Sequence, residues 1–358
     1  MPSKVQYQFQ EPVVVRLSDN ERSTGIISEE HVASAITAMH RDGLVVLENA
    51  VDVDHVDKLN TLLSAEAEAM AKLPTTHFND NSVDGKPTGN MSQGPPLDPA
   101  LMYEDVWANQ PAATVLSSLL GPRPVVTYVN GNTALGGFNG ARQRIHADLT
   151  FNHAQFPFAI VTNYYLIDVS PANGSTELWL GSHRDTTFRD HRNCVPTDGL
   201  EETEYDTSND NTRDFGIRDE CLEARRAWAP PIQPTVKRGS VVLRDLRLWH
   251  AGLSNPSPDP RIMLAFVHTP WWYQSPAKVV LPESTKPLVD QWASRKVDPI
   301  HFNAHYVPRD VDHKTVVFNP NFSSQNRGYL DMLPKGIGMG FIFSDVATGK
   351  SAEAEEKK

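Results

Sequence analysis

A histidine and an aspartate separated by one residue could hold a metal ion within residues 143–148. Side chains alternate between faces along an extended strand, so His146 and Asp148 would project from the same face. An imidazole nitrogen and a carboxylate oxygen would then converge on one point. A second histidine, for which His250 is the best candidate, would complete the two-histidine, one-carboxylate set that binds Fe(II) and leaves other positions open.

The same His-x-Asp pattern occurs elsewhere in the chain, at His40/Asp42, His55/Asp57 and His183/Asp185. The first pair suits a protein-kinase loop, but Leu47 stands where that loop needs an asparagine, and no glycine-rich phosphate loop precedes it. The second pair lies in an expected helix, where positions i and i+2 do not face each other. The third pair leads into a polar loop, so we expect a strand end there rather than a metal ligand.

An arginine follows His250 after a proline-rich turn at 255–260. We expect His250 to end one strand and Arg261 to begin the next, so that both could face one cavity across a hairpin. A planar guanidinium suits one end of a dicarboxylate whose other end chelates the metal, which is the geometry that 2-oxoglutarate needs. From the residues alone, core histidines satisfied by hydrogen bonds remain an open alternative.

Composition restricts the class of protein. The chain has 358 residues, 39% of them hydrophobic, which is enough for one large domain or two small ones. A net charge of -11 and a pI near 5.6 argue against nucleic acid or an anionic membrane surface as the main partner. The two cysteines, Cys194 and Cys221, exclude a disulfide framework. With no membrane-length apolar run and no signal-peptide pattern, we expect a soluble, cytoplasmic protein.

Helix patterns precede strand patterns along the chain. We expect a polar N-terminal arm over residues 1–27, followed by three helices, one short buried strand and one long loop. The helices are expected at 28–43, 52–70 and 111–120, the strand at 44–47 and the loop at 74–99, within which 90–96 could fold over a pocket.

Strand signals dominate from Val125 onward. Short β-branched and aromatic runs alternate with Gly, Pro and Asn turns, at 125–129, 158–167, 177–180, 240–244 and 261–267. This order indicates an antiparallel sandwich or barrel rather than alternating β-α units. Residues 185–228 are acidic and irregular, and we interpret them as an insertion.

Several motifs together resemble the phytanoyl-CoA dioxygenase family of Fe(II)/2-oxoglutarate oxygenases, and especially its fungal natural-product tailoring members. They are His146-x-Asp148, the Asn173-Gly174 turn leading to Gly181-Ser182-His183-Arg184, and Gly239-Ser240-Val241-Val242-Leu243 leading to Trp249-His250-Ala251-Gly252 and Arg261. The similarity runs from about Asp42 to about Val267. Leu180 replaces the proline usual before Gly-Ser-His, which affects a turn and not the metal ligands.

The resemblance implies a mainly β fold with flanking helices and a double-stranded β-helix core, also called a jelly roll or cupin-like fold. We expect a dioxygenase domain over 28–280, with its jelly-roll core at about 125–268 and the insertion 185–228 inside it. Residues 281–345 would form an extension packed on the same domain, where it could cover the pocket or make a homodimer contact. Residues 346–358 would be a disordered tail.

The resemblance also implies the roles of individual residues. Arg261 would pair with the distal carboxylate of 2-oxoglutarate. Gln143 matches a position that contacts the cosubstrate in several members, and Asn163 falls where others place a tryptophan. O2 would be the second cosubstrate, with ascorbate in support. The implied iron ligands are His146, Asp148 and His250.

The implied reaction couples conversion of 2-oxoglutarate to succinate and CO2 with oxidation of a substrate C–H bond. Hydroxylation is the default outcome, and desaturation, epoxidation or ring closure are the others. Aromatic residues near the motifs suggest a small, apolar, ring-containing substrate of secondary metabolism, although at least half of them are expected to be ordinary core. They are Phe151, Phe156, Phe158, Trp271, Trp272 and Tyr273.

Three alternatives remain open. An acyl-CoA α-hydroxylase would need a basic cluster for the CoA phosphates, and the only dense one is Arg225-Arg226. A non-catalytic jelly-roll binding protein would have no need of an intact ligand set. A zinc hydrolase on the same ligands would leave Arg261 without a role.

Overall fold

The computed structural model describes residues 11–79, 82–148, 158–184, 186–187, 190–192, 216–273 and 278–315. The strands of its main sheet are β1 (Val14–Arg16), β2 (Leu44–Glu48), β3 (Asn90–Ser92), β4 (Val125–Ala134), β5 (Ile160–Tyr165), β7 (Val241–Asp245), β9 (Arg261–Thr269) and β11 (His301–Phe302). Their order is β1-β2-β7-β5-β9-β4-β11, and β3 pairs with β4. Two small sheets pair β6 (Glu177–Leu178) with β8 (His250–Ala251), and β10 (Val279–Pro282) with β12 (Ala304–Val307).

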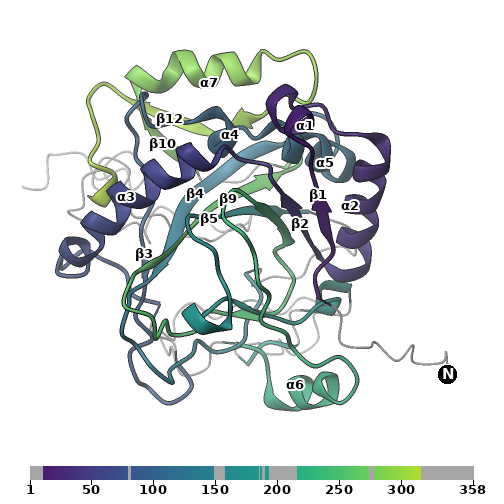
Figure 1. Cartoon of the computed structure of the whole chain (residues 1–358), viewed down its shortest axis with the longest axis vertical. Coiled ribbons are helices and arrows are strands. Elements are labelled where there is room, and N and C mark those ends of the chain that lie inside the picture. Colours follow the sequence, from purple (N-terminus) through teal and green to yellow (C-terminus); the bar gives the residue numbers. More distant parts are fainter. Residues whose placement is uncertain are drawn as a thin grey trace, which may run out of the picture.

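The helices surround this sheet-dominated core. They are α1 (Asp19–Thr24), α2 (Glu29–Asp42), α3 (Val53–Met70), α4 (Glu104–Trp107), α5 (Gln110–Leu120), α6 (Asp219–Arg226) and α7 (Lys286–Ala293). In Figure 1, α7 and α6 lie at opposite ends of the molecule, with the main sheet between them. None of the described helices is long and apolar enough to cross a membrane.

The connection from α2 to β2 follows from local sequence signals. The Ser28 side chain accepts a hydrogen bond from the backbone N–H of His31, which satisfies a donor of the first helical turn. Gly43 ends the helix with a φ of 76°, a left-handed conformation that favours glycine. The apolar strand β2 then begins at once and pairs with β7.

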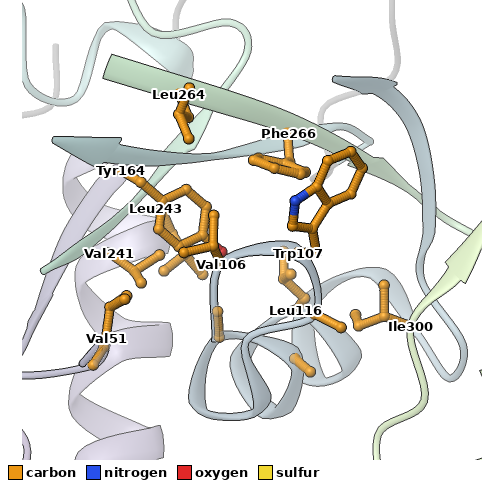
Figure 2. Packing of buried hydrophobic residues seen from close by; sticks show 14 of the residues in the cluster. Val51, Val106, Trp107, Leu116, Tyr164, Val241, Leu243, Leu264, Phe266 and Ile300 are labelled. Carbon is orange, nitrogen blue, oxygen red and sulfur yellow. The ribbon is translucent and has the colours of Figure 1, made fainter. Parts of the chain in front are cut away.

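The largest core lies between the helices and one face of the main sheet. Alternate residues of β9, such as Leu264 and Phe266, point into it. Trp107 of α4 meets the Phe266 ring edge to face at 5.1 Å (Figure 2). Trp292 and Ile300 belong to the same cluster, so residues beyond 280 contribute to the main core.

The opposite face of the main sheet carries a second layer. Leu178 of β6 packs there in one cluster with Val242 of β7 and Tyr165 of β5. The segment that contains His146 joins this layer through an isolated β-bridge to His250. The candidate metal-binding motif therefore lies over this face of the sheet.

Several expectations differ from the structure. The 1–27 arm supplies β1 and α1, and β1 pairs in parallel with β2. The long 74–99 loop contains β3, which pairs with the far end of β4, where the registered partners are Asn132 to Ala134. Part of the 185–228 insertion is helical, as α6. Residues 193–215 of the insertion, residues 316–345 of the 281–345 extension and the 346–358 tail lie outside the described residues.

Candidate metal centre

Three predicted ligands come together in space. The backbones of His146 and His250 exchange two hydrogen bonds of 3.0 and 2.9 Å, so the two side chains lie side by side, with ring centroids 4.3 Å apart. The Nε2 atoms of His146 and His250 lie 3.7 and 3.6 Å from Asp148 Oδ1. His146 sits in this isolated bridge rather than in the continuous strand that the sequence suggested. Within the described ranges, these three residues are the one group of His, Cys, Asp or Glu spaced to hold a metal ion.

Each histidine is oriented by the chain just before it. His146 Nδ1 donates to the Arg144 carbonyl at 2.8 Å, and His250 Nδ1 donates to the Leu248 carbonyl at 3.0 Å. With the proton on Nδ1, the lone pair of Nε2 faces Asp148. Burial, followed by the positive charge of Arg244, holds the pKa of His250 well below its usual value; burial also lowers the pKa of His146. Both rings are therefore in the neutral form that binds metals.

Arg244 orients the carboxylate. Its Nη2 donates to Asp148 Oδ2 at 2.7 Å, which leaves Oδ1 for the two imidazoles. Its Nη1 lies 3.4 Å from His250 Nδ1, but both atoms are donors in the tautomer above, so only the aspartate bond counts. Burial alone would raise the pKa of Asp148, but the charge of Arg244 and its hydrogen bond hold that pKa well below its usual value. Sequence analysis missed Arg244, whose one signal was a buried charge at the end of an apolar strand.

Arg261 is fully buried, and none of its side-chain nitrogens has a hydrogen-bond partner among the described residues. Burial lowers its pKa. It begins β9 opposite Ala134, on the sheet face that also carries Met263. The expected hairpin with His250 is wrong, because β8 pairs with β6 whereas β9 pairs with β4 and β5. A buried cation without a partner is costly, so this position suits a carboxylate ligand.

Gln143 and Asn163 differ in how their side chains are used. Gln143 Oε1 accepts from the backbone N–H of Gly252 at 2.8 Å, and its Nε2 donates to the Asn79 carbonyl at 3.4 Å. Gln143 therefore ties the motif to the segment after His250. Asn163 lies in β5 between Val242 and Ala265, buried, with no partner for its Nδ2 in the described part of the chain.

The other His-x-Asp pairs are engaged elsewhere or only partly described. His55 stacks on Tyr103 and bonds Asp105 at 3.0 Å, and Asp57 pairs with Arg238. Asp42 is held by its neighbour Arg41. His183 is buried, and burial lowers its pKa to about 4. Asp185 lies outside the described residues.

The aromatic and basic residues singled out in the sequence lie in different environments. Phe158 is core and meets Tyr273 edge to face at 4.2 Å, Trp271 and Trp272 are about half exposed, and Phe151 and Phe156 lie outside the described residues. The Arg225-Arg226 cluster is used internally: Arg225 donates to the Leu180 carbonyl, and both guanidinium groups lie over tryptophan rings.

Comparisons with known proteins place this chain in a family. The chain is similar to the solved structure of EctD from S. alaskensis with 2-oxoglutarate and 5-hydroxyectoine, at 21% identity over 73% of this chain and 81% of that chain, with a TM-score of 0.46. It is similar to HygX from Streptomyces hygroscopicus with nickel, 2-oxoglutarate and hygromycin B, at 13% identity, 71% and 91% coverage and a TM-score of 0.44.

A third similar structure is the epimerase SnoN in complex with Fe3+, alpha ketoglutarate and nogalamycin RO, at 16% identity, 80% and 98% coverage and a TM-score of 0.46. The family assignment rests instead on a family model, phytanoyl-CoA dioxygenase, which matches residues 39–263 and hence more than half of the chain. The matched range includes the three converging side chains and the buried arginine. The chain therefore belongs to the phytanoyl-CoA dioxygenase family, and it is an oxidoreductase of the Fe(II)- and 2-oxoglutarate-dependent class.

Proposed function

We propose that this enzyme oxidises a C–H bond of a small, apolar, ring-containing molecule, with Fe(II) held by His146, Asp148 and His250. The observation that carries the assignment is the convergence of two Nε2 atoms on Asp148 Oδ1, while the other polar atom of each side chain is bonded to the protein. Two imidazoles and one carboxylate suit Fe(II) and leave coordination positions for other ligands.

Arg261 supports the second part of the proposal. Its guanidinium would donate a planar pair of hydrogen bonds to the distal carboxylate of 2-oxoglutarate, and that anion would neutralise the buried charge. Asn163 Nδ2, also unpaired among the described residues, is available for a polar contact on the same sheet. Gln143 would act indirectly, by fixing the backbone on both sides of the triad.

Bound iron and 2-oxoglutarate would supply the oxidation, in which O2 is reduced, 2-oxoglutarate becomes succinate and CO2, and a substrate C–H bond is oxidised. The side chains supply no acid or base. They hold the metal from one side, neutralise the cosubstrate and exclude water. Hydroxylation is the default outcome we propose, with desaturation, epoxidation or ring closure as the alternatives.

The architecture supports this proposal as well. We propose that the main sheet and the layer containing β6 and β8 form the double-stranded β-helix, with residues 28–280 as the catalytic domain and 281–345 as an extension of the same domain. The burial of Trp292 and Ile300 in the main core favours this division. The homodimer and the cytoplasmic location stay predictions.

We favour secondary metabolism over acyl-CoA oxidation because the arginines considered for the CoA phosphates already make contacts within the protein. Arg225 donates to the Leu180 carbonyl, and Arg225 and Arg226 both lie over tryptophan rings. A substrate screen that follows succinate release, with CoA thioesters and natural products in separate arms, tests this preference. Turnover triggered only by CoA thioesters would reverse it.

The metal assignment is tested with Asp148→Ala and the control Asp57→Ala. Asp57 is another His-x-Asp aspartate, paired with Arg238 at the surface. Asp148→Ala should lose Fe(II) and succinate release while the protein remains folded; Asp57→Ala should keep both. The wild-type protein should be active with Fe(II) and ascorbate and inactive with Zn(II) alone. Retained iron and turnover in Asp148→Ala would refute the proposed site.

A further inference from the structure

A groove of about 510 Å³ lies at one end of the main sheet, and none of the three triad residues lines it. Its floor is made by neighbouring strands, because Val125 of β4 pairs with His301 of β11 on one side and with Thr269 of β9 on the other. Trp271 and Tyr273, just after β9, form a wall. The groove has no role in the reaction described above.

The groove is cationic in an acidic protein. Arg123 and Lys278 line it, and neither forms an ion pair with a carboxylate among the described residues. None of the described aspartates or glutamates lines it, although the chain carries a net charge of -11. Uncompensated positive charge within a concave surface attracts anions.

Flat rings and unpaired polar atoms lie beside these cations. The Trp271 side chain is 51% exposed, and the Arg123 guanidinium lies 5.6 Å from its ring centroid. Thr127 is only 2% exposed, and its Oγ1 has no partner among the described residues; His301 is partly exposed, and its Nε2 has none either. Buried polar atoms are usually bonded, so these two atoms leave unmet hydrogen-bonding capacity beside the groove.

The backbone conformation of Arg123 allows a substitution that tests its charge. Arg123 stands between Pro122 and Pro124 with a φ of 60°, where glycine or asparagine is more easily accommodated. A charged side chain thus stands at a backbone conformation that L-residues other than asparagine rarely adopt. Asparagine at 123 would remove the charge without adding strain.

The groove is separate from the metal centre but close to it. Tyr273 lines the groove and contacts Phe158; the Ala159 carbonyl then bonds Leu246 N–H at 3.2 Å. The Leu246 carbonyl in turn accepts from Asp148 N–H at 2.9 Å. A short chain of contacts therefore connects the groove to the triad.

We propose that this groove binds a small molecule that combines a flat ring with an anionic group, whether carboxylate, sulfonate or phosphate. The ring stacks against Trp271, and the anion bonds Arg123 and Lys278. This binding needs neither iron nor 2-oxoglutarate.

The test uses 1-anilinonaphthalene-8-sulfonate, an anion with fused rings, titrated into the full chain by calorimetry. Arg123→Asn and Lys278→Gln should each weaken binding roughly tenfold, the effect of losing one charge-assisted hydrogen bond. Lys72→Gln, an exposed lysine at the end of α3, should bind as the wild type does. The affinity should also fall as salt is raised.

Two further titrations locate the binding. N-phenyl-1-naphthylamine has the same rings without the sulfonate and should bind at least tenfold more weakly. Saturating 2-oxoglutarate and the Asp148→Ala variant should leave sulfonate binding unchanged. The proposal is overturned if the two groove variants bind like the wild type, if the neutral analogue binds equally well, or if 2-oxoglutarate displaces the sulfonate.

Discussion

Each candidate iron ligand forms a hydrogen bond to the protein with the polar atom that does not face the metal position. The imidazoles bond carbonyls two residues earlier in the chain, and the carboxylate bonds Arg244. Such outer partners fix tautomer and orientation before a metal arrives. The convergence of His146, Asp148 and His250 could be predicted from the sequence, whereas the contact with Arg244 could not, since nothing in the local sequence reveals that β7 runs beside Asp148.

The first residue-scale prediction concerns Arg244→Met. Without its cation, Asp148 is a largely buried anion in the metal-free protein, so we expect a loss on the order of 2 kcal/mol in the free energy of unfolding. Bound Co(II) would replace the lost charge, so the gap in unfolding temperature between metal-free and Co(II)-loaded protein should widen.

Arg247→Met is the matched control. Arg247 pairs with Asp245, another buried aspartate at the end of β7 but not a candidate ligand. Its loss should lower both unfolding temperatures equally. An equal loss in both forms for Arg244→Met would contradict a role in holding the ligand.

Arg261 gives the second residue-scale prediction. Arg261→Met removes a buried, unpaired cation, so the ligand-free protein should be as stable as the wild type or more stable. The affinity of this variant for 2-oxoglutarate should be weaker by on the order of 1.5–3 kcal/mol. Arg261→Lys, which keeps the charge but loses the planar fork, should lose a similar amount of affinity. Anaerobic calorimetry with 2-oxoglutarate measures this, and unchanged affinity would assign the distal carboxylate to another residue.

At the scale of elements, the end of α2 packs closely against the ring of His183. A Cβ at Gly43 would lie 2.5 Å from His183 Nδ1, and the φ of +76° disfavours any side chain. His183 belongs to the Gly-Ser-His motif, so this contact joins α2 to the segment that leads into the second layer.

Gly43→Ala should therefore lower the free energy of unfolding by more than Gly137→Ala. Gly137 has a similar φ of +82° but open space around its Cβ position, so its substitution carries the backbone strain of a positive φ without a contact. The difference between the two variants in chemical denaturation isolates the His183 contact. Equal losses would mean that the ring moves aside at no cost.

Local signals predicted most elements, and pairings at a distance were missed. Ser28 and Gly43 mark α2 in the sequence, and the structure has it at Glu29–Asp42. The sequence predicts a loop where β3 lies, because its three polar-flanked residues gain strand geometry only from β4, some forty positions later. It predicts a hairpin at His250 for the same reason: the strand partner of His250, Leu178, lies far earlier in the chain.

At the scale of the whole molecule, buried histidines govern acid stability. Burial lowers the pKa of His268 to about 3. Between about pH 6.5 and pH 3 the imidazole is therefore neutral in the native protein, whereas the same histidine in the unfolded chain takes up a proton. The unfolded state then binds more protons, and native stability falls as the pH falls through this window.

His268→Gln keeps a partner for the Thr162 hydroxyl, which lies 3.2 Å from His268 Nε2. Between pH 6 and 4 the variant should lose stability more slowly than the wild type, by up to about 1.4 kcal/mol per pH unit. Urea denaturation at several pH values measures the slope. The same substitution at exposed His40 is the control; parallel curves for wild type and His268→Gln would contradict the expectation.

The two ends of the main sheet lie outside the family match. β1 closes one edge from residues 14–16, and β11 closes part of the other from residues 301–302, while the match at 39–263 stops inside β9. A chain trimmed to the matched residues would expose the backbone of β2 and β4 as open edges, which recruit strands from other molecules. In this protein the flanking segments therefore cover edges of the sheet, and the smallest segment that keeps both edges covered is longer than the part that the family model matches.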